Sequence, residues 1–298
     1  MFNSFRKERG VLHLKNPLAV AIPTCCDCSE NIRIGYVLEA LAMQPASAHY
    51  DSFDVYVWDE GVVPVTSDRW VRLIFDLLIQ RGHTPNYIRR GPSRGVAQAR
   101  KNLISLIPEA HGKILLVDDD LMVMPGSVDL LLEEASKVKR FGFIQGAKIE
   151  LDAKRGYHND INQINKNDKS VGTVPLWFGD AAFLLINRSA LSHVDWSVMT
   201  RFSEEGLPGE DVALTLMIAD NEPCFGVPSA TGYHMSLQTP RWKWEVPSDL
   251  LQLELLKPVV SAETLEKAMP HIAKYVRDGA CETSTALDLR VSEEHRHD

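Results

Sequence analysis

The chain contains a short apolar stretch that ends in three consecutive carboxylates, Lys113-Ile114-Leu115-Leu116-Val117-Asp118-Asp119-Asp120. An apolar run of this length predicts a buried strand, and the acidic triplet then falls at the carboxyl end of that strand. Adjacent carboxylates repel one another, so we expect a cation, or a ligand that brings one, to occupy this place. The alternative is a turn that leads into the next helix.

Strand and helix signals alternate in the first part of the chain. Strands are expected at 18–23, 53–58, 87–88 and 113–117, and helices at 31–41, 70–80 and 96–107. This alternation predicts a parallel α/β sheet, whose ligands bind beyond the carboxyl ends of the strands. Pro23, Thr24, Asp59 and the acidic triplet all lie at such ends, and a purely structural interpretation does not predict that convergence.

The second part of the chain continues the pattern with longer interruptions. Strands are expected at 141–151, 181–186 and 227–234, and helices at 128–138, with Ser127 as N-cap, and at 212–218. Residues 152–173 are strongly polar, and both a lid or acceptor-binding loop and a disordered segment remain open. Residues 250–276 predict an apolar helical region that packs on the domain or forms a homodimer contact.

Composition restricts the partners and the compartment. The 298 residues include 32 basic and 40 acidic side chains, and a net charge of −8 argues against a protein held on nucleic acid by surface charge. No apolar run approaches the roughly 20 residues that span a bilayer, and the first ten residues lack a signal-like apolar core. Three of the five cysteines crowd into 25–28, which disfavours a disulfide framework and leaves redox or zinc chemistry as a minor alternative. We therefore expect a soluble protein in a reducing, cytoplasmic compartment.

Five short motifs follow one another in order. They are Pro23-Thr24, Asp59-Glu60-Gly61-Val62, Ala99-Arg100-Lys101, Asp118-Asp119-Asp120 and Glu210-Asp211. This order resembles the nucleotide-sugar-dependent glycosyltransferases of the GT-A fold, particularly glycosyltransferase family 2, over about residues 18–236. The family's own motifs are a Pro-Thr-like turn, Asp-Asp-Gly-Ser, Ala-Arg-Asn, Asp-x-Asp and Glu-Asp. Glu60, Val62 and Lys101 depart from them, which weakens inference about the base and the sugar.

The resemblance implies an α/β fold of the GT-A, Rossmann-like type, with a mostly parallel central sheet flanked by helices and a C-terminal helical extension. The expected divisions are an N-terminal segment at 1–16, a catalytic domain at 17–240, and a helical extension with a polar tail at 241–298. Within the catalytic domain, the nucleotide-sugar half covers about 17–125 and the acceptor half about 126–240.

The resemblance also implies a set of donor-binding residues. They are Pro23, Thr24, Cys25, Asp59, Arg100, Asp118 and Asp119. Asp59 would accept a hydrogen bond from the base or ribose, although a turn residue would look the same in sequence. Arg100 would stabilise the nucleotide pocket, unless it lies on a solvated helix face. Asp119 is expected to have no catalytic part.

A metal site is implied at Asp120, with Asp118 near the ribose or in the water shell of the metal, since alternate residues of an extended segment point the same way. His234 matches the position where several GT-A enzymes supply a third ligand, with an ordinary buried histidine as the alternative. Oxygen ligands alone suit Mg²⁺, whereas an added imidazole favours Mn²⁺. The donor would be a UDP-sugar, or a GDP-sugar as second choice.

Catalysis is assigned by the same resemblance. Asp211 is the candidate general base of an inverting transfer, and Glu210 could bind acceptor hydroxyls. As the alternative, both carboxylates only favour a helix N-terminus. Trp242, Trp177 and Gly209 are candidate acceptor-binding residues, for a glycan, lipid-linked, protein or small-molecule acceptor.

Two other function classes fit the sequence less well. A nucleotidyltransferase would need a Gly-rich, basic loop after the first strand, which residues 23–26 lack. A catalytically inactive nucleotide-sugar-binding protein would not need Asp118, Asp120 and Asp211, all of which are present.

Overall fold

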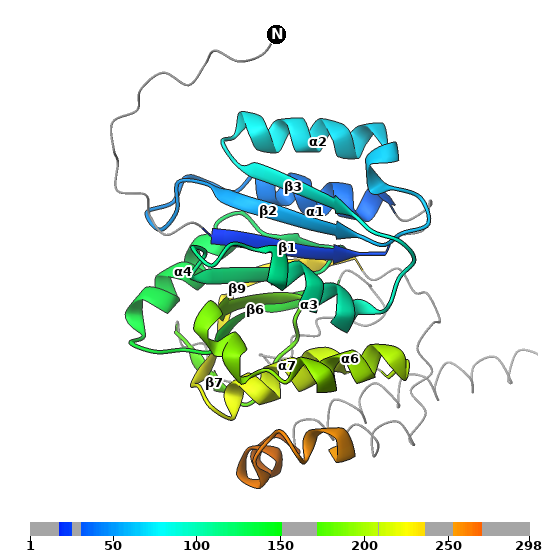
Figure 1. The fold of residues 1–298 in the computed structure, drawn as a ribbon. Coiled ribbons are helices and arrows are strands. Elements are labelled where there is room, and N and C mark those ends of the chain that lie inside the picture. Colours follow the sequence, from blue (N-terminus) through cyan, green and yellow to red (C-terminus); the bar gives the residue numbers. More distant parts are fainter. Residues whose placement is uncertain (1–17, 26–30, 151–171, 208, 236–252, 270–298) are drawn as a thin grey trace, which may run out of the picture.

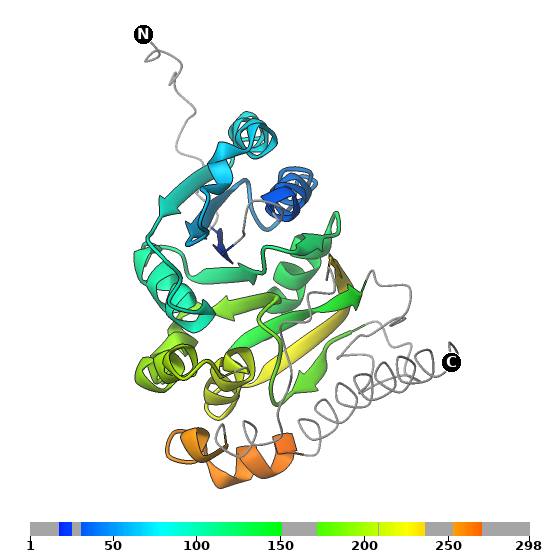
Figure 2. The same cartoon turned by 90° about the vertical axis from the view of Figure 1, so that its right-hand side faces the viewer.

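The computed structural model describes residues 18–25, 31–150, 172–207, 209–235 and 253–269. A nine-stranded sheet runs through the molecule, with helices on both faces (Figures 1 and 2). The strands are β1 (Leu18–Thr24), β2 (Phe53–Asp59), β3 (Thr84–Arg89), β4 (Lys113–Val117), β5 (Leu121–Val123), β6 (Phe143–Glu150), β7 (Val174–Leu176), β8 (Phe183–Asn187) and β9 (Cys224–His234). The helices are α1 (Asn31–Ala42), α2 (Arg69–Gln80), α3 (Val96–Leu106), α4 (Ser127–Lys137), α6 (Trp196–Glu204) and α7 (Glu210–Ala219), with 3-10 turns at Val65–Ser67 and Arg188–His193.

The predicted α/β class, a central sheet flanked by helices, is confirmed. The strand order is β3-β2-β1-β4-β8-β6-β9-β5, with β7 beside β9. Strands β3, β2, β1 and β4 are parallel, and their carboxyl ends meet at one edge (Figure 1). Beyond β4 the sheet is mixed, because β8 lies antiparallel to both β4 and β6. The predicted parallel order therefore holds for one half of the sheet.

Burial explains why the strands and helices of the parallel half could be predicted from the sequence. All seven residues of β1 are buried, as expected for a strand that is covered by helices on both faces. Helix α2 turns Val71, Ile74 and Leu78 inward at helical spacing, and the carboxylate of Asp68 caps its start by accepting from the Trp70 N–H. Helices α1, α2 and α4 pack on one face of the sheet, and α3, α6 and α7 on the other.

Ser127 is not the N-cap of α4, as the sequence predicted. Gly126 occupies that position with a φ of 82°, and Ser127 is the first helical residue. The buried hydroxyl of Ser127 accepts a hydrogen bond of 2.9 Å from the backbone N–H of Thr231 in β9. Its role is therefore to fix the helix to the sheet.

Residues 253–269 form two short helical segments that pack on the domain. Their apolar side chains share one core with α7, and the buried ones are Leu255, Leu256, Val260, Leu265 and Ala268. The sequence left two arrangements open for the apolar C-terminal region, packing on the domain or a homodimer contact. The described residues pack on the domain. A homodimer contact stays a prediction. In the described part of the chain, no helix is long and apolar enough to cross a bilayer.

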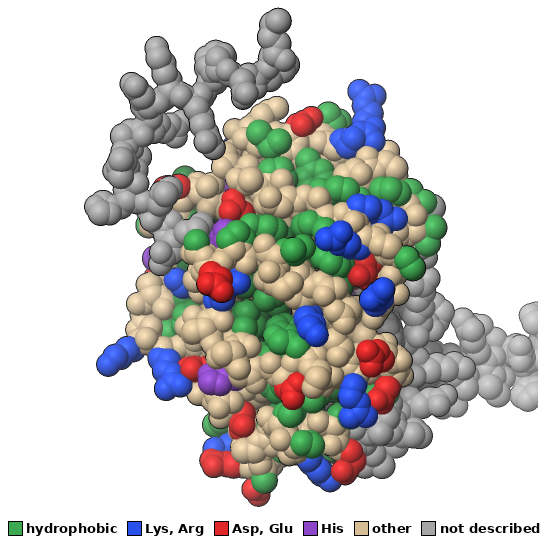
Figure 3. Space-filling model, in the orientation of Figure 1, with side chains coloured by type: hydrophobic (Ala, Val, Ile, Leu, Met, Phe, Trp, Pro, Cys, Tyr) green, Lys and Arg blue, Asp and Glu red, His purple; other side chains and the backbone are tan. Residues whose placement is uncertain are grey.

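Charges are mixed over the face of the molecule shown in Figure 3. Acidic and basic side chains lie interspersed there, and the described residues of that face form no extended area of one sign.

Candidate active site

Three strand ends are joined at the carboxyl edge of the parallel half. Thr24 at the end of β1 lies opposite Asp59 at the end of β2, and the Thr24 carbonyl accepts from the Glu60 N–H at 2.9 Å. The Thr24 hydroxyl donates to Asp119 Oδ2 at 2.6 Å, which ties in the segment that follows β4. The polar groups that the sequence placed at strand ends thus converge.

The carboxylates of the triplet have different partners. Asp118 Oδ1 is 2.9 Å from Arg100 Nη2, Asp119 accepts from Thr24, and Asp120 Oδ2 is 3.3 Å from His234 Nε2. Strand β5 begins directly after the triplet and pairs with β9, which brings His234 beside Asp120. Two predicted metal ligands are therefore adjacent, although they are 114 positions apart in the chain.

Arg100 connects the triplet to the Glu-Asp pair. It is buried in α3, with Nη1 2.7 Å from Glu210 Oε1 in addition to its contact with Asp118. Burial opposes its charge, but the two carboxylates raise the pKa of Arg100. The alternative of a solvated helix face is wrong, because only 3% of the side chain is exposed.

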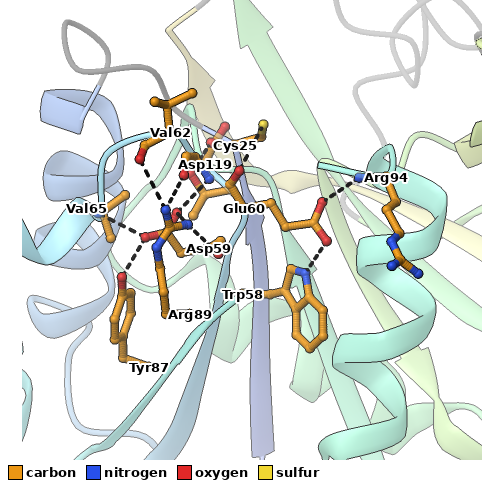
Figure 4. A network of polar contacts seen from close by, with 12 residues as sticks. Cys25, Trp58, Asp59, Glu60, Val62, Val65, Tyr87, Arg89, Arg94 and Asp119 are labelled. Atoms are coloured by element: carbon orange, nitrogen blue, oxygen red, sulfur yellow. Dashed lines mark hydrogen bonds and ion pairs between the residues drawn. The ribbon is translucent and has the colours of Figure 1, made fainter. Parts of the chain in front are cut away.

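Asp59 is fully buried and surrounded by protein donors (Figure 4). Oδ1 accepts from the Gly61 N–H at 2.9 Å and from Arg89 at 3.3 Å, and Oδ2 accepts from the Val65 N–H at 3.0 Å and from the Tyr87 hydroxyl at 2.6 Å. Burial and the bond to Asp59 raise the pKa of Tyr87 to about 12. These four bonds use the acceptor sites of a carboxylate, which favours a turn-ordering role. The nucleoside role of Asp59 stays a prediction.

Glu60 points away from Asp59, toward α3 (Figure 4). Its buried carboxylate accepts from the Trp58 indole N–H at 2.8 Å and from the Arg94 backbone N–H at 3.1 Å. In the sequence Glu60 was only a departure from the family motif. Its longer side chain holds the loop between β3 and α3. Trp58 lies two positions earlier, on the same face of the extended chain, and was the sequence signal that Glu60 could have a partner there.

The two carboxylates at the start of α7 lie in different surroundings. Glu210 is engaged by Arg100, whereas Asp211 accepts from the Val212 N–H at 2.8 Å and forms no ion pair among the described residues. Burial, with the charges of Glu210 and Asp180, raises the pKa of Asp211 well above its ordinary value. Gly209 precedes the helix with a φ of 88°, a conformation that favours glycine.

Protonation also separates Asp118 from Asp120. Burial and the neighbouring carboxylates, led by Asp180, raise the pKa of Asp118 to about 6, against the effect of Arg100. Burial acts in the same direction on Asp120, but the hydrogen bond and charge of His234, with Arg33 and Lys148, lower the pKa of Asp120. Asp120 is thus held in the ionised form that a metal ligand requires.

Three site residues were missed in the sequence. Arg33 Nη1 in α1 lies 3.7 Å from Asp120 Oδ2, and Lys148 in β6 forms an ion pair with Asp180. Asp180 also accepts from the Ala182 N–H at 2.8 Å, and although burial opposes it, Lys148 lowers the pKa of Asp180 to about 2. A lysine inside an apolar strand was a usable signal for Lys148, whereas nothing in the sequence marked Arg33.

The residues present could bind a divalent cation only if a bound ligand supplied further coordinating atoms. In the described ranges, no three His, Cys, Asp or Glu side chains are placed to hold an ion. Asp120 and His234 form a two-residue donor pair, which leaves the other coordination positions to oxygens from outside the protein. The phosphates of a nucleoside-diphosphate donor are suited to supply them.

The remaining predicted residues are less informative. Cys25 is exposed, and its thiol lies 3.8 Å from the Glu60 carbonyl. Trp177 is 39% exposed, with Lys267 Nζ 4.6 Å from the ring centroid, so the C-terminal segment partly covers it. Trp242, Cys26, Cys28 and most of the loop predicted at 152–173 lie outside the described residues.

No protein-family model and no curated protein sequence matches the chain. Solved structures do match it. The crystal structure of S. aureus TarS residues 1–349 is 13% identical with a TM-score of 0.52, over 74% of this chain and 60% of that one. GalNAc-T7 with UDP, GalNAc and Mn²⁺ is 12% identical with a TM-score of 0.57, over 81% of this chain and 48% of that one. The mannosyltransferase PcManGT from Pyrobaculum calidifontis, in complex with GDP-Man and Mn²⁺, is 14% identical with a TM-score of 0.55, over 93% and 81%.

The chain thus spans less than two thirds of the first two of these proteins. At this level of identity the likeness concerns the fold. The chain has the GT-A fold of nucleotide-sugar glycosyltransferases.

Proposed function

We propose that this protein is a metal-dependent glycosyltransferase that moves a sugar from a nucleoside-diphosphate donor to an acceptor hydroxyl, with inversion at the anomeric carbon. One observation carries the proposal: Arg100 joins the acidic triplet, with His234 beside it, to Glu210-Asp211 at the ligand-binding edge of a GT-A sheet. Of the similar structures, one holds UDP, GalNAc and Mn²⁺, and another holds GDP-Man and Mn²⁺.

Asp120 and His234 are the residues that would hold the cation, with Mn²⁺ favoured over Mg²⁺ because one ligand is an imidazole. When bound, the cation neutralises charge on the departing diphosphate. Pro23, Thr24, Cys25 and Asp118 line the donor side of this centre, for which UDP is favoured and GDP is the second choice.

Asp211 acts as the general base. As the acceptor oxygen attacks the anomeric carbon, its proton passes to Asp211, and the bond from that carbon to the phosphate oxygen breaks with its electron pair on the oxygen. The raised pKa of Asp211 suits it for taking a proton. Arg100 fixes Glu210 beside it, where Glu210 can accept a hydrogen bond from an acceptor hydroxyl.

The test is the release of nucleoside diphosphate from UDP- and GDP-sugars in the presence of Mn²⁺. We expect Asp120→Ala or added EDTA nearly to abolish release, and Asp76→Ala, an exposed carboxylate of α2, to leave it unchanged. Unchanged turnover of Asp120→Ala would contradict the metal role. Donor binding without any release from the wild type would instead indicate an inactive nucleotide-sugar-binding protein.

A further inference from the structure

Asp120 is bordered by more positive charge than a metal ligand needs. Its Oδ2 faces His234 Nε2 at 3.3 Å and Arg33 Nη1 at 3.7 Å. The side chains of Arg33 and Asp120 are only 13% and 18% exposed, so water screens this pair weakly. Lys148 lies opposite Gly232 in the pairing of β6 with β9, two residues from His234, and adds a second fixed charge.

Arg33 competes with any cation for Asp120. An arginine stays protonated in proteins, so its charge cannot be removed by titration. The 3.7 Å between Arg33 Nη1 and Asp120 Oδ2 is an ion-pair distance, longer than that of a direct hydrogen bond. A divalent cation on the same oxygen would lie close to the guanidinium, and like charges repel strongly in a partly buried site.

A diphosphate removes this conflict. Phosphate oxygens accept paired hydrogen bonds from a guanidinium, and such charge-assisted pairs are stronger than a loose ion pair. Arg33 is in the first turns of α1, close to the carboxyl edge where a GT-A donor binds. A diphosphate placed there would draw Arg33 from Asp120 and offset its charge.

We infer that Arg33 makes cation binding at Asp120 conditional on the donor diphosphate. Without a diphosphate, Arg33 neutralises Asp120 and the cation binds weakly. With a diphosphate, Arg33 pairs with the phosphates and Asp120 becomes available to the cation. The inference rests on the proposed function, because it requires that the diphosphate and the cation share this site.

The test separates the two ligands. Binding of Mn²⁺ alone is followed by electron paramagnetic resonance of the free ion, and binding of UDP or GDP alone by calorimetry in EDTA. We expect Arg33→Gln to bind Mn²⁺ at least about tenfold more tightly than the wild type, since the competing charge is gone, and the nucleotide at least about tenfold more weakly. Arg33→Lys keeps the charge and is expected to stay close to the wild type in Mn²⁺ binding.

Controls assign the effect to Asp120. Arg140→Gln removes an exposed arginine paired with Glu222 and is expected to change neither affinity. The tighter Mn²⁺ binding of Arg33→Gln should disappear in Arg33→Gln/Asp120→Asn; if it persists, the ion lies elsewhere and the inference fails. Equal Mn²⁺ affinities of Arg33→Gln and the wild type, with circular dichroism showing both folded, would overturn it as well. A wild type that binds neither nucleotide, with or without Mn²⁺, would refute the proposed function instead.

Discussion

Replacing Arg100 by Met should destabilise the fold, because it leaves two partly buried carboxylates without their cation. Arg100 is 3% exposed, and it separately engages Asp118 at 2.9 Å and Glu210 at 2.7 Å. Removing one partner of a buried ion pair costs about 3–5 kcal/mol. The carboxylates are 29% and 15% exposed, so solvent offsets part of this, and we expect a loss of about 3 kcal/mol.

Urea denaturation followed by circular dichroism measures this loss directly. For a chain of this size the entropy of unfolding is about 0.6 kcal/mol/K, so about 3 kcal/mol corresponds to a fall in Tm of roughly 5 °C. The stability of Arg100→Lys should lie between those of the wild type and Arg100→Met, because one ammonium group cannot replace the two guanidinium nitrogens that bind the two carboxylates. A loss below about 1 kcal/mol for Arg100→Met would refute the view that this pair of contacts holds α3, β4 and α7 together.

Removing the orphaned charges should recover part of the loss. In Arg100→Met/Asp118→Asn/Glu210→Gln no uncompensated carboxylate remains at these positions, so we expect about half of the stability to return. If the triple variant is no more stable than Arg100→Met, the cost comes from packing around the arginine stem and the electrostatic explanation is wrong.

Two further predictions concern protonation. Burial lowers the pKa of His83, whose Nδ1 accepts a hydrogen bond from the Phe53 N–H at 3.3 Å. Near pH 6.5 the His83 side chain is therefore protonated to a greater extent in the unfolded chain than in the folded chain. The free energy of unfolding should therefore fall as the pH is lowered from 7.5 to 5.5, and less steeply in His83→Asn; equal slopes would contradict this. Asp211→Asn should reduce transfer by about 10²–10⁴-fold and spare donor binding, and the acid limb of the wild-type rate should lie above the ordinary Asp range. Lost donor affinity in calorimetry would count against the base assignment.

The parts of the fold that sequence could predict are those whose pattern is local. Strands β1, β2 and β4 are nearly continuous apolar runs, because helices cover both faces, and α2 shows a regular inward stripe. Strands β5 and β7 have three residues each, too few for any periodicity. The direction of β8 was also unreadable, since an apolar run is the same in either direction.

Helix α6 was missed for a different reason. Its buried residues, Val198, Met199 and Phe202, form a narrow stripe within a short polar stretch. The Asp195 carboxylate accepts from the Ser197 and Val198 N–H groups and marks the start of the helix. An aspartate followed by serine is a capping signal that can be recognised in the sequence.

In the site, the sequence indicated the acids and His234, but it could not show which residues pair with Asp118, Glu210 and Asp180. The motifs gave Asp118, Asp120 and Glu210, yet the contact of Arg100 with Glu210 joins residues 110 positions apart. Such contacts depend on how the chain crosses the sheet. For the same reason, the sequence could not show that Asp59 and Glu60 point in opposite directions, Asp59 into its own turn and Glu60 toward the loop before α3.

The carboxylates of the acidic triplet repel one another, as expected. The neighbouring cations decide which of these carboxylates has a raised pKa. Asp120 and Asp180 lie beside Arg33, His234 and Lys148, and the pKa of each is lowered. Asp118 pairs with Arg100 and Asp211 forms no ion pair among the described residues, and the pKa of each is raised. Carboxylates outnumber fixed cations among the described residues of this centre, so an anionic donor should bind more weakly alone than together with a divalent cation. The same excess of negative charge should favour departure of the more highly charged nucleoside diphosphate once the sugar has been transferred.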